Sequence, residues 1–353
     1  MTTIYDVARQ AGVSVATVSR VLNGEAHVAP ETRQKVLHVV QQLGYRRNGL
    51  ARGLATRATR LLAFLVPDIS NPYFPEVARG VEDAANAAGY HVILCNTDDR
   101  ARKEQEYLEA LLDRRIDGAV IIPVAEGSRV PKLLKGTGLP AVLLDRDIDP
   151  ELDTVMADNV AGARQAMRHL LGLGHRRIAA ITGPTRSSTA RERLEGYRQA
   201  LAEHEIPFDP DLVVEGDFRR PSGYQGMLRL LDLPQPPTAV FAANDMMALG
   251  ALHAAEERGV RVPEDLAVVG FDDIALAEAT RPKLTTVAQP KYEMGRLGVE
   301  LLLQRIPEGG RRGQGRRPQR LVLESRLVVR QSSLIVRSQL APEPVPAANG
   351  KGV

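Results

Sequence analysis

The stretch TIYDVARQAGVSVATVSRVLNG, residues 3–24, decides how the amino-terminal part of this chain folds. Thr3 is followed three residues later by Asp6, the spacing of a capping pair at the start of a helix. The apolar residues behind this pair recur at the spacing of one helix face; they are Ile4, Val7, Ala8 and Ala11. Gly12 tolerates positive φ, so we expect the first helix to end there in a tight turn.

A second helix follows this turn, and a third follows the second. Ser14 is the expected cap of the second helix, whose apolar side consists of Val18, Val21 and Leu22. Pro30 and Glu31 are typical of a helix start, and the third helix is expected to run to about Leu43. Two short helices joined by a glycine turn and braced by a third form a helix-turn-helix.

The charge of the chain is distributed unevenly. Residues 1–60 hold nine Lys/Arg and three Asp/Glu, a net of +6, and the other residues hold 37 basic against 40 acidic, a net of −3. A basic segment on a near-neutral body is the electrostatic pattern of phosphate binding. A small helical cap would have no use for this excess, so the sequence predicts a head that binds double-stranded DNA.

In helix-turn-helix proteins the second helix enters the major groove. Val15 and Ala16 are small enough to contact a thymine methyl group, and Arg20 can donate two hydrogen bonds to a guanine. Other polar residues of the head are candidates for contacts with phosphates, which position the protein; they are Tyr5, Ser14, Thr17, Ser19, Asn23 and Thr32.

Residues 3–24, together with RRNGLARGLAT at 46–56, resemble the lactose-repressor family of bacterial transcription regulators. In that family the segment after the third helix is a hinge that folds on the operator and wedges a leucine into the minor groove. The resemblance implies that Leu54 is this wedge, with Ala51 beside it and Asn48 and Arg52 near the DNA backbone. An inserted apolar side chain separates two stacked base pairs, which costs free energy. The resulting bend brings the DNA against more protein surface, and these contacts offset that cost.

The hinge should be a weak helix. Gly49 and Gly53 lower its helix propensity, so we expect it to be disordered without DNA. The alternative interpretation of this segment is a plain flexible linker. Arg46 and Arg47 stand where relatives usually have a proline, which affects the direction in which the chain enters the hinge.

From Leu61 onward, short apolar runs alternate with helical segments. LLAFLVP, YHVILCN, GAVIIP and AVLLD form one series of expected strands, with helices near 74–88, 102–114 and 128–136. IAAIT, VVEG, AVFAAN and LAVVGFDD form a second series, again with helices between. Strands that alternate with helices predict parallel sheets. The predicted fold is therefore an all-α head and an α/β body of two parallel-sheet subdomains with a cleft between them.

Polar and aromatic residues follow these strands repeatedly, and ligands of open α/β sheets bind at the carboxyl ends of strands. Aromatic faces suit the C–H surface of a sugar, while carboxylate, amide and guanidinium groups suit its hydroxyls. The candidate effector-binding residues are Asn71, Tyr73, Phe74, Asp145, Arg146, Arg191, Phe218, Asn244, Asp272 and Gln289.

The segment from 61 to 330 resembles the periplasmic sugar-binding fold that the repressor family shares. The candidate residues, in order, resemble the site of the ribose-binding members, which implies D-ribose or a related pentose as effector. VSVATVSRV (13–21) and VARGVEDAA (77–85) are also similar to the catabolite-control branch. That branch responds to a phosphorylated carrier protein as corepressor, and this is the alternative function.

The expected domain boundaries follow. A helix-turn-helix domain at 1–45 precedes a hinge at 46–60 and a body at 61–337. The amino-terminal subdomain comprises about 61–160 and 290–318, and the carboxyl-terminal subdomain about 161–289 and 319–337. GGRRGQGRRPQR at 309–320 is expected to be an exposed loop before a final strand pair near 321–329, and the Pro- and Ala-rich tail at 338–353 is expected to be disordered.

Several protein classes are excluded. The chain has no G-x-G-x-x-G after its first strand, no phosphate-binding P-loop and no H-E-x-x-H, so we expect neither an enzyme nor a cofactor. Its seven histidines show no ligand spacing, and no metal site is predicted. Cys95 lies in an apolar run and is a core residue. Without an export signal or a membrane span, the protein is expected to be cytoplasmic and not a secreted sugar carrier.

A pseudo-palindromic operator calls for a two-fold protein, so a homodimer is expected, with helices near 72–88 and 244–259 at its interface. No leucine heptad in the tail supports a tetramer. In the expected mechanism, sugar closes the cleft, the paired hinges lose their register, and affinity for the operator falls.

Overall fold

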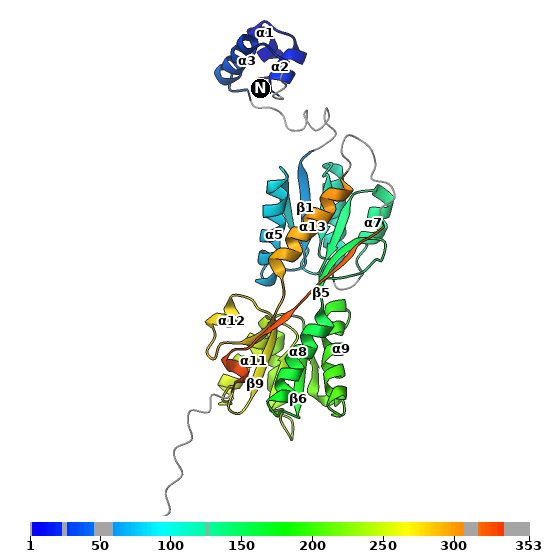
Figure 1. The fold of residues 1–353 in the computed structure, drawn as a ribbon, viewed down its shortest axis with the longest axis vertical. Coiled ribbons are helices and arrows are strands. Elements are labelled where there is room, and N and C mark those ends of the chain that lie inside the picture. Colours follow the sequence, from blue (N-terminus) through cyan, green and yellow to red (C-terminus); the bar gives the residue numbers. More distant parts are fainter. Residues whose placement is uncertain (1, 23–26, 46–58, 125–126, 307–316, 335–353) are drawn as a thin grey trace, which may run out of the picture. The chain divides into compact units, whose positions relative to one another are not determined.

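A computed structural model of the protein describes residues 2–22, 27–45, 59–124, 127–306 and 317–334 (Figure 1). The chain divides into two units, Met1–Arg60 and Leu61–Val353. The first is all-α and the second is α/β, as the sequence predicts. Most of the predicted hinge, most of the loop at 309–320 and the whole tail at 338–353 lie outside the described residues.

Three helices build the head: α1 (Ile4–Ala11), α2 (Val15–Leu22) and α3 (Pro30–Gln42). The predicted cap of α1 is present, because the backbone N–H of Thr3 donates to the Asp6 carboxylate at 2.9 Å and Thr3 Oγ1 accepts from Asp6 N at 3.4 Å. Gly12 has φ 64° and ends α1 in the left-handed conformation. Ser14 Oγ accepts from Thr17 N at 3.1 Å and caps α2.

The core of the head is made by all three helices. Its buried side chains are Val7, Ala8, Ala11, Val18, Val21, Val36 and Val39. Ile4 and Leu22, which were expected to face inward, are half-buried and pack against the edge of this core. The helix-turn-helix therefore has a hydrophobic core of its own.

The body contains two six-stranded sheets, and each sheet is parallel along nearly all of its length. The first has the order β11 (Arg320–Leu323), β5 (Asp153–Ala157), β4 (Ala141–Leu144), β3 (Gly118–Ile121), β1 (Leu61–Val66), β2 (His91–Asn96). The second has the order β12 (Arg326–Val328), β10 (Thr285–Ala288), β9 (Ala267–Asp272), β8 (Ala239–Ala242), β6 (Ile178–Thr182), β7 (Val213–Glu215).

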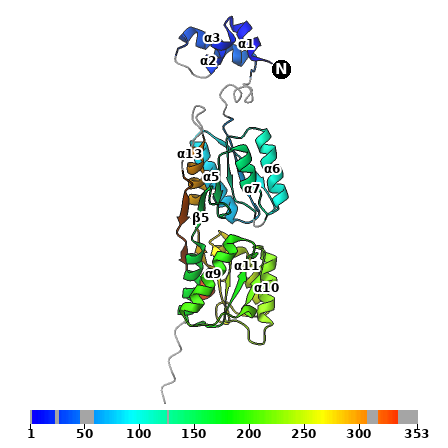
Figure 2. The ribbon, with the colours of Figure 1, turned by 90° about the vertical axis from the view of Figure 1, so that its right-hand side faces the viewer.

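Helices cover both faces of each sheet (Figure 2). On the first sheet, α5 (Tyr73–Ala87) and α13 (Lys291–Arg305) lie on one face, and α6 (Ala101–Asp113) and α7 (Val130–Thr137) lie on the other. On the second sheet, α8 (Asn159–Gly172) and α9 (Ser188–Glu203) oppose α10 (Arg220–Leu231) and α11 (Asp245–Glu257). The short helix α12 (Leu276–Ala279) follows β9.

The structure differs from the sequence prediction in three strands, β5, β11 and β12. The strands of the expected final pair at 321–329 do not pair with each other, because β11 pairs with β5 in the first sheet and β12 pairs with β10 in the second. β12 is antiparallel to its neighbour. Residues 320–323 thus belong to the amino-terminal subdomain and not to the carboxyl-terminal one, and β5 itself was not predicted.

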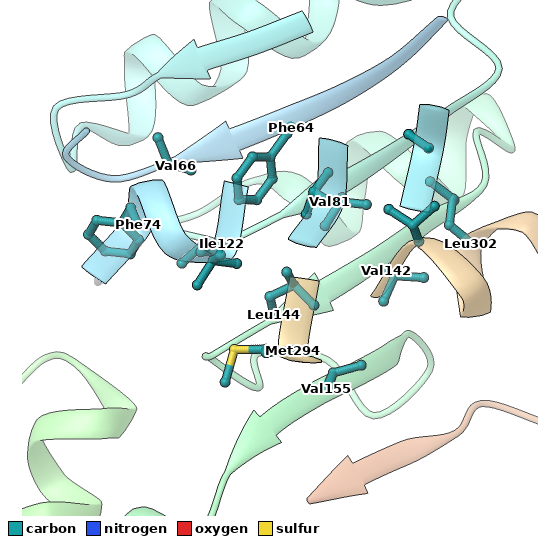
Figure 3. Close-up of a cluster of buried hydrophobic side chains, with 14 of the residues drawn as sticks. Phe64, Val66, Phe74, Val81, Ile122, Val142, Leu144, Val155, Met294 and Leu302 are labelled. Carbon is teal, nitrogen blue, oxygen red and sulfur yellow. The ribbon is translucent and has the colours of Figure 1, made fainter. Parts of the chain in front are cut away.

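Large aliphatic and aromatic side chains fill the space between sheets and helices. Figure 3 shows the cluster under α5 and α13, where Phe64, Val81, Leu144 and Met294 meet with almost no exposed surface. The central strands, such as β1, β3, β4 and β8, are buried on both faces, so their apolar runs are continuous and do not alternate, as parallel sheets require.

Several pairs of neighbouring helices cross closely at glycines. A Cβ on Gly80 of α5 would lie 2.0 Å from the carbonyl oxygen of Tyr292 in α13, and a Cβ on Gly295 would lie 2.2 Å from that of Val77. Gly223 and Gly250 let α10 approach α11 in the same way. The crossing of α5 and α13 bears on the predicted cleft, because α5 begins at the carboxyl end of β1, where candidate effector residues lie.

Candidate functional site

A cavity of about 430 Å³ lies at the carboxyl ends of strands from both sheets. Eight of the ten predicted effector residues line it; they are Asn71, Tyr73, Phe74, Asp145, Arg146, Phe218, Asn244 and Asp272. Some come from loops after β1 and β4 of the first sheet, and others follow β7, β8 and β9 of the second. The strands thus bring together side chains as far apart in the sequence as Asn71 and Asp272.

The wall formed by the first subdomain combines aromatic rings with a carboxylate. The Tyr73 hydroxyl donates to Asp145 Oδ1 at 3.1 Å, and the rings of Tyr73 and Phe74 meet edge to face with centroids 5.2 Å apart. Burial raises the pKa of Tyr73 well above its usual value, and the negative charge of Asp145 adds to this shift. Tyr73 therefore remains a neutral hydrogen-bond donor. Asn71 Oδ1 accepts from Tyr73 N at 3.1 Å and supports the start of α5.

Arg146 is buried beside this wall with one donor unused. Its Nη1 donates to the carbonyl oxygen of Pro123 at 2.7 Å and to Asp99 Oδ1 at 3.2 Å. Its Nε is buried, has no hydrogen-bond partner among the described residues and lies 3.9 Å from Asp145 Oδ2. A buried N–H group without a partner costs free energy, so this position favours a ligand atom that accepts a hydrogen bond.

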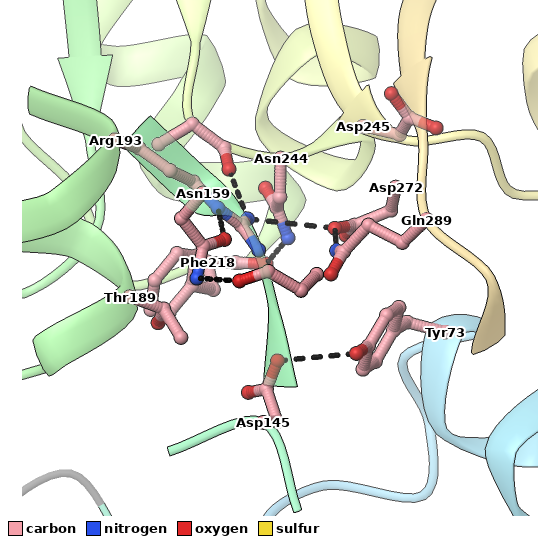
Figure 4. Close-up of polar contacts among 12 residues, drawn as sticks. Tyr73, Asp145, Asn159, Thr189, Arg193, Phe218, Asn244, Asp245, Asp272 and Gln289 are labelled. Carbon is pink, nitrogen blue, oxygen red and sulfur yellow. Dashed lines mark hydrogen bonds and ion pairs between the residues drawn. The ribbon is translucent and has the colours of Figure 1, made fainter. Parts of the chain in front are cut away.

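Asp272 dominates the opposite wall (Figure 4). Its Oδ1 accepts from Gln289 Nε2 at 2.7 Å and lies 3.4 Å from Arg193 Nη1. Lys291 Nζ donates to the carbonyl oxygens of Asp272 and Asp273, each at 2.7 Å. Burial raises the pKa of Asp272 to about 6, although Arg193 and Lys291 act in the opposite direction. Gln289 does not line the cavity and instead orients this carboxylate.

Arg193 occupies the position that the sequence analysis assigned to Arg191. Its Nε donates to Asn159 Oδ1 at 2.9 Å, its Nη1 donates to the carbonyl oxygen of Ala243 at 2.6 Å, and its guanidinium stacks 3.9 Å from the ring centroid of Phe271. Arg191 lies on another face of α9, where its Nη1 donates to the carbonyl oxygens of Thr185 and Arg186. The prediction of Arg191 is thus corrected to Arg193.

Phe218 lies across the cavity under tight backbone control. It has φ 66°, and its carbonyl oxygen accepts from Asn244 Nδ2 at 2.9 Å. Its ring packs so close to Gly183 that a Cβ there would lie 2.1 Å from ring carbon Cζ. Asn244 Oδ1 also accepts from Met247 N at 3.0 Å and caps α11. Thr189 also lines the cavity, and the sequence analysis missed it together with Arg193.

The cavity therefore presents charged and amide groups between aromatic faces. Asp145 and Asp272 accept hydrogen bonds from hydroxyls, Arg146 donates to them, and Tyr73 and Phe218 offer ring surface. The charges on each wall are balanced by the neighbouring guanidinium group. This arrangement suits a small neutral molecule that is rich in hydroxyls.

On the head, the predicted base-contacting residues lie on α2. Ala16 and Arg20 are exposed, while Val15 is half-buried and packs against the head core. Val15 therefore has less surface to offer a base than was expected. Tyr5, in α1, is 71% exposed.

The predicted phosphate contacts are only partly described. Ser14 Oγ lies 2.9 Å from Thr17 Oγ1, and Ser19 and Thr32 are half-buried. Five predicted DNA contacts fall outside the described residues; they are Asn23, Asn48, Ala51, Arg52 and Leu54.

Within the described ranges, no three His, Cys, Asp or Glu side chains are grouped so that they could hold a metal ion. In the same ranges no helix is both long and apolar enough to cross a membrane. Cys95 is buried in β2, as expected.

Two parts of the chain match known families. Residues 3–48 match the bacterial regulatory proteins of the lacI family, and residues 167–333 match the periplasmic binding protein-like domain. The transcriptional regulator DegA of Bacillus subtilis is 39% identical over 94% of this chain and 98% of its own length. The ribose operon repressor of Halalkalibacterium halodurans is 41% identical over 87% and 91%. Catabolite control protein A of Priestia megaterium is 40% identical over 85% and 91%.

Solved structures extend the comparison to the fold. The lac repressor dimer bound to operator and the anti-inducer ONPF has a TM-score of 0.85 at 32% identity, over 95% of this chain and 99% of that one. A LacI family regulator from Enterococcus faecium with bound ribose has a TM-score of 0.68 at 34% identity, over 77% and 98%.

Proposed function

The chain belongs to the LacI family of bacterial regulatory proteins, and we propose that its cleft binds D-ribose or a related pentose as effector. Like its relatives, it is a DNA-binding transcriptional repressor, and it is not an enzyme. In this proposal, occupancy of the cleft controls the affinity of the head for an operator.

One observation carries the proposal: a buried carboxylate faces the cavity from each subdomain, Asp145 from the first and Asp272 from the second. Each lies beside a buried guanidinium, Arg146 or Arg193. A sugar hydroxyl both donates and accepts, so a ring of hydroxyls can bind both walls at once and hold the cleft closed. The similarity to a ribose operon repressor and to a ribose-bound relative supports a pentose.

Calorimetric titration tests this site. The protein is titrated with D-ribose, D-xylose, D-glucose and D-galactose, and we expect D-ribose to bind tightest. A site built for one set of hydroxyls discriminates strongly against analogues that misplace them. Absence of heat with every monosaccharide would contradict the assignment of the cleft.

The affinity for D-ribose is expected to fall as the pH drops below about 6. The pKa of Asp272 is raised to about 6 by burial, so its carboxylate is charged above that value and protonated below it. Hydroxyls that donate to the carboxylate favour its charged form. The affinity for D-ribose is therefore highest above this pKa, and it falls by up to about tenfold for each pH unit below it. Calorimetry from about pH 5 to about pH 7.5 checks this, and a flat profile in the native protein would contradict it. In Asp272→Asn the dependence should disappear.

In the head, Arg20→Ala is expected to weaken specific operator binding by roughly 1–3 kcal/mol and to relax the preference at one guanine. Its matched control is Arg9→Ala in α1, where Arg9 pairs with Asp6. If Arg20 contacted only a phosphate, its loss would weaken binding to all duplexes equally. Anisotropy titrations with single-base operator variants, at fixed salt, measure both effects. An unchanged operator affinity would remove Arg20 from sequence recognition.

We propose further that the protein acts as a homodimer on a pseudo-palindromic operator. Leu94 on the edge strand β2 is 46% exposed and Leu276 in α12 is 44% exposed. A second cavity, lined by Leu249 and Leu252 of α11, opens beside Leu276. Burial of these side chains in a dimer would remove apolar surface from water. Sedimentation equilibrium should give twice the chain mass of 38.5 kDa, and Leu252→Glu should shift the protein toward monomer.

In the proposed mechanism, sugar closes the cleft, the two amino-terminal subdomains of the dimer shift, and the hinges with Leu54 no longer insert together. Operator affinity therefore falls, and by linkage the operator weakens sugar binding by the same factor. No further cofactor is required.

A catabolite-control regulator is the second candidate, because catabolite control protein A is 40% identical to this chain. Such a regulator would bind a phosphorylated carrier protein as corepressor. A pull-down with that carrier distinguishes the two, since the pentose proposal predicts no capture at physiological salt.

A further inference from the structure

An ion pair spans the mouth of the effector cleft. Arg219, in the loop after β7 of the second sheet, lies with its Nη2 3.2 Å and its Nε 3.3 Å from Asp68 Oδ2, in the loop after β1 of the first sheet. Both residues line the cavity. The pair therefore links the two subdomains. Because the Arg219 side chain is 57% exposed and the Asp68 side chain 24% exposed, the pair lies where the cavity meets solvent, which is its mouth.

The carboxylate side of this pair is preorganised. Asp68 Oδ1 accepts from Ser70 N at 3.1 Å and from Ser70 Oγ at 2.5 Å, which fixes the carboxylate and directs Oδ2 to Arg219. The next residue, Ile69, donates its N–H to Asn96 Oδ1 at 2.8 Å and ties the loop to the end of β2.

The arginine side is connected to the effector site itself. Arg219 N donates to Asp217 Oδ1 at 2.9 Å, and the carbonyl oxygen of Arg219 accepts from Ser222 Oγ at 2.8 Å. Directly before it, the carbonyl oxygen of Phe218 accepts from Asn244 Nδ2. Any ligand that contacts Phe218 or Asn244 therefore acts on the backbone that places Arg219.

We propose that Asp68 and Arg219 form a latch that closes the cleft over a single sugar ring and selects against ligands that project through its mouth. This inference rests on the proposed effector site. A single ring leaves the ion pair intact, whereas a sugar with a bulky substituent has to break it. The pair is partly exposed, so its contribution is modest, about two- to fivefold in affinity, and is screened by salt.

The first test compares D-ribose with adenosine, which is ribose carrying a bulky base. In Asp68→Asn we expect ribose affinity to fall about two- to fivefold and the preference for ribose over adenosine to shrink. The charge swap Asp68→Arg with Arg219→Asp should restore both. Asp232→Asn, which removes the exposed ion pair with Arg258 in the second subdomain, is the matched control. Unchanged affinities in Asp68→Asn, or a loss that the swap does not restore, would overturn the latch.

A second readout keeps the latch testable if ribose does not bind the native protein, which would contradict only the proposed effector. Spin labels on Glu109→Cys in α6 and Arg229→Cys in α10, in a Cys95→Ser background, report the distance between the subdomains. Asp68→Asn should lengthen or broaden this distance, and the swap should reverse the change. An identical distance distribution in Asp68→Asn would overturn the proposal.

Discussion

Replacing Arg193 with alanine is expected to abolish effector binding and to lower the free energy of unfolding by about 3–5 kcal/mol. Arg193 is 4% exposed, and its Nη1 pairs with Asp272 Oδ1 at 3.4 Å in the same wall of the cavity. Its loss leaves that carboxylate buried beside the cavity without its guanidinium, and it deprives the carbonyl oxygen of Ala243 and the amide of Asn159 of their donor. Calorimetry measures the first effect, and urea unfolding monitored by circular dichroism measures the second.

The neighbouring arginine supplies the control. Arg191→Ala removes an equal charge from the same helix, but the Arg191 guanidinium donates to loop carbonyl oxygens at the protein surface, so the free energy of unfolding should change by less than about 0.5 kcal/mol. Arg193→Lys keeps the charge but loses the planar fork. This variant separates loss of the site from loss of the fold, and full effector affinity in it would refute the role given to Arg193.

Gly80→Ala is the second substitution with a large expected effect. Its Cβ would lie 2.0 Å from the carbonyl oxygen of Tyr292, a backbone atom that cannot move without shifting α13. Overpacking of this kind costs about 1–3 kcal/mol and occasionally more. Because α5 begins with Tyr73 and Phe74, a shift of this helix should also weaken effector binding. Thermal and urea unfolding give the stability, and calorimetry gives the affinity.

Gly136→Ala in α7 is the matched control for Gly80. It lies in a helix, and a Cβ there would meet no atom within 4 Å. Alanine should therefore raise stability by up to about 1 kcal/mol, because glycine is the poorer helix former. If the two substitutions changed stability equally, the close crossing of α5 and α13 would not be the reason that position 80 requires glycine.

The sequence was sufficient to predict the strands that consist of continuous apolar runs, such as Leu61–Val66, because burial on both faces leaves a strong signal. It was also sufficient for eight of the cavity residues, since parallel strands deliver their carboxyl ends to one edge. β5 was missed because Asp153–Ala157 begins with an acidic residue. In the structure this carboxylate is buried by a bidentate pair with Arg305, a partner far along the chain.

Arg193 illustrates a signal that was present and not used. Residues two apart on a helix point about 200° away from each other, so Arg191 and Arg193 cannot both face the cavity. Thr189, Arg193 and Tyr197 recur at a spacing of four, and all three are buried. Tyr197 is the apolar residue that marks the inward face of α9. Helical phase would therefore have selected Arg193 over Arg191.

The most direct test of the account is the affinity of the intact protein for its operator with and without saturating D-ribose. The operator is first selected from random duplexes, and the titrations are run at one salt concentration, because phosphate contacts make every affinity salt-dependent. We expect ribose to raise the operator Kd by roughly 5- to 150-fold and Arg193→Ala to lose this response. An operator Kd that ribose leaves unchanged, while calorimetry shows the cleft to be filled, would contradict the coupling of the two sites.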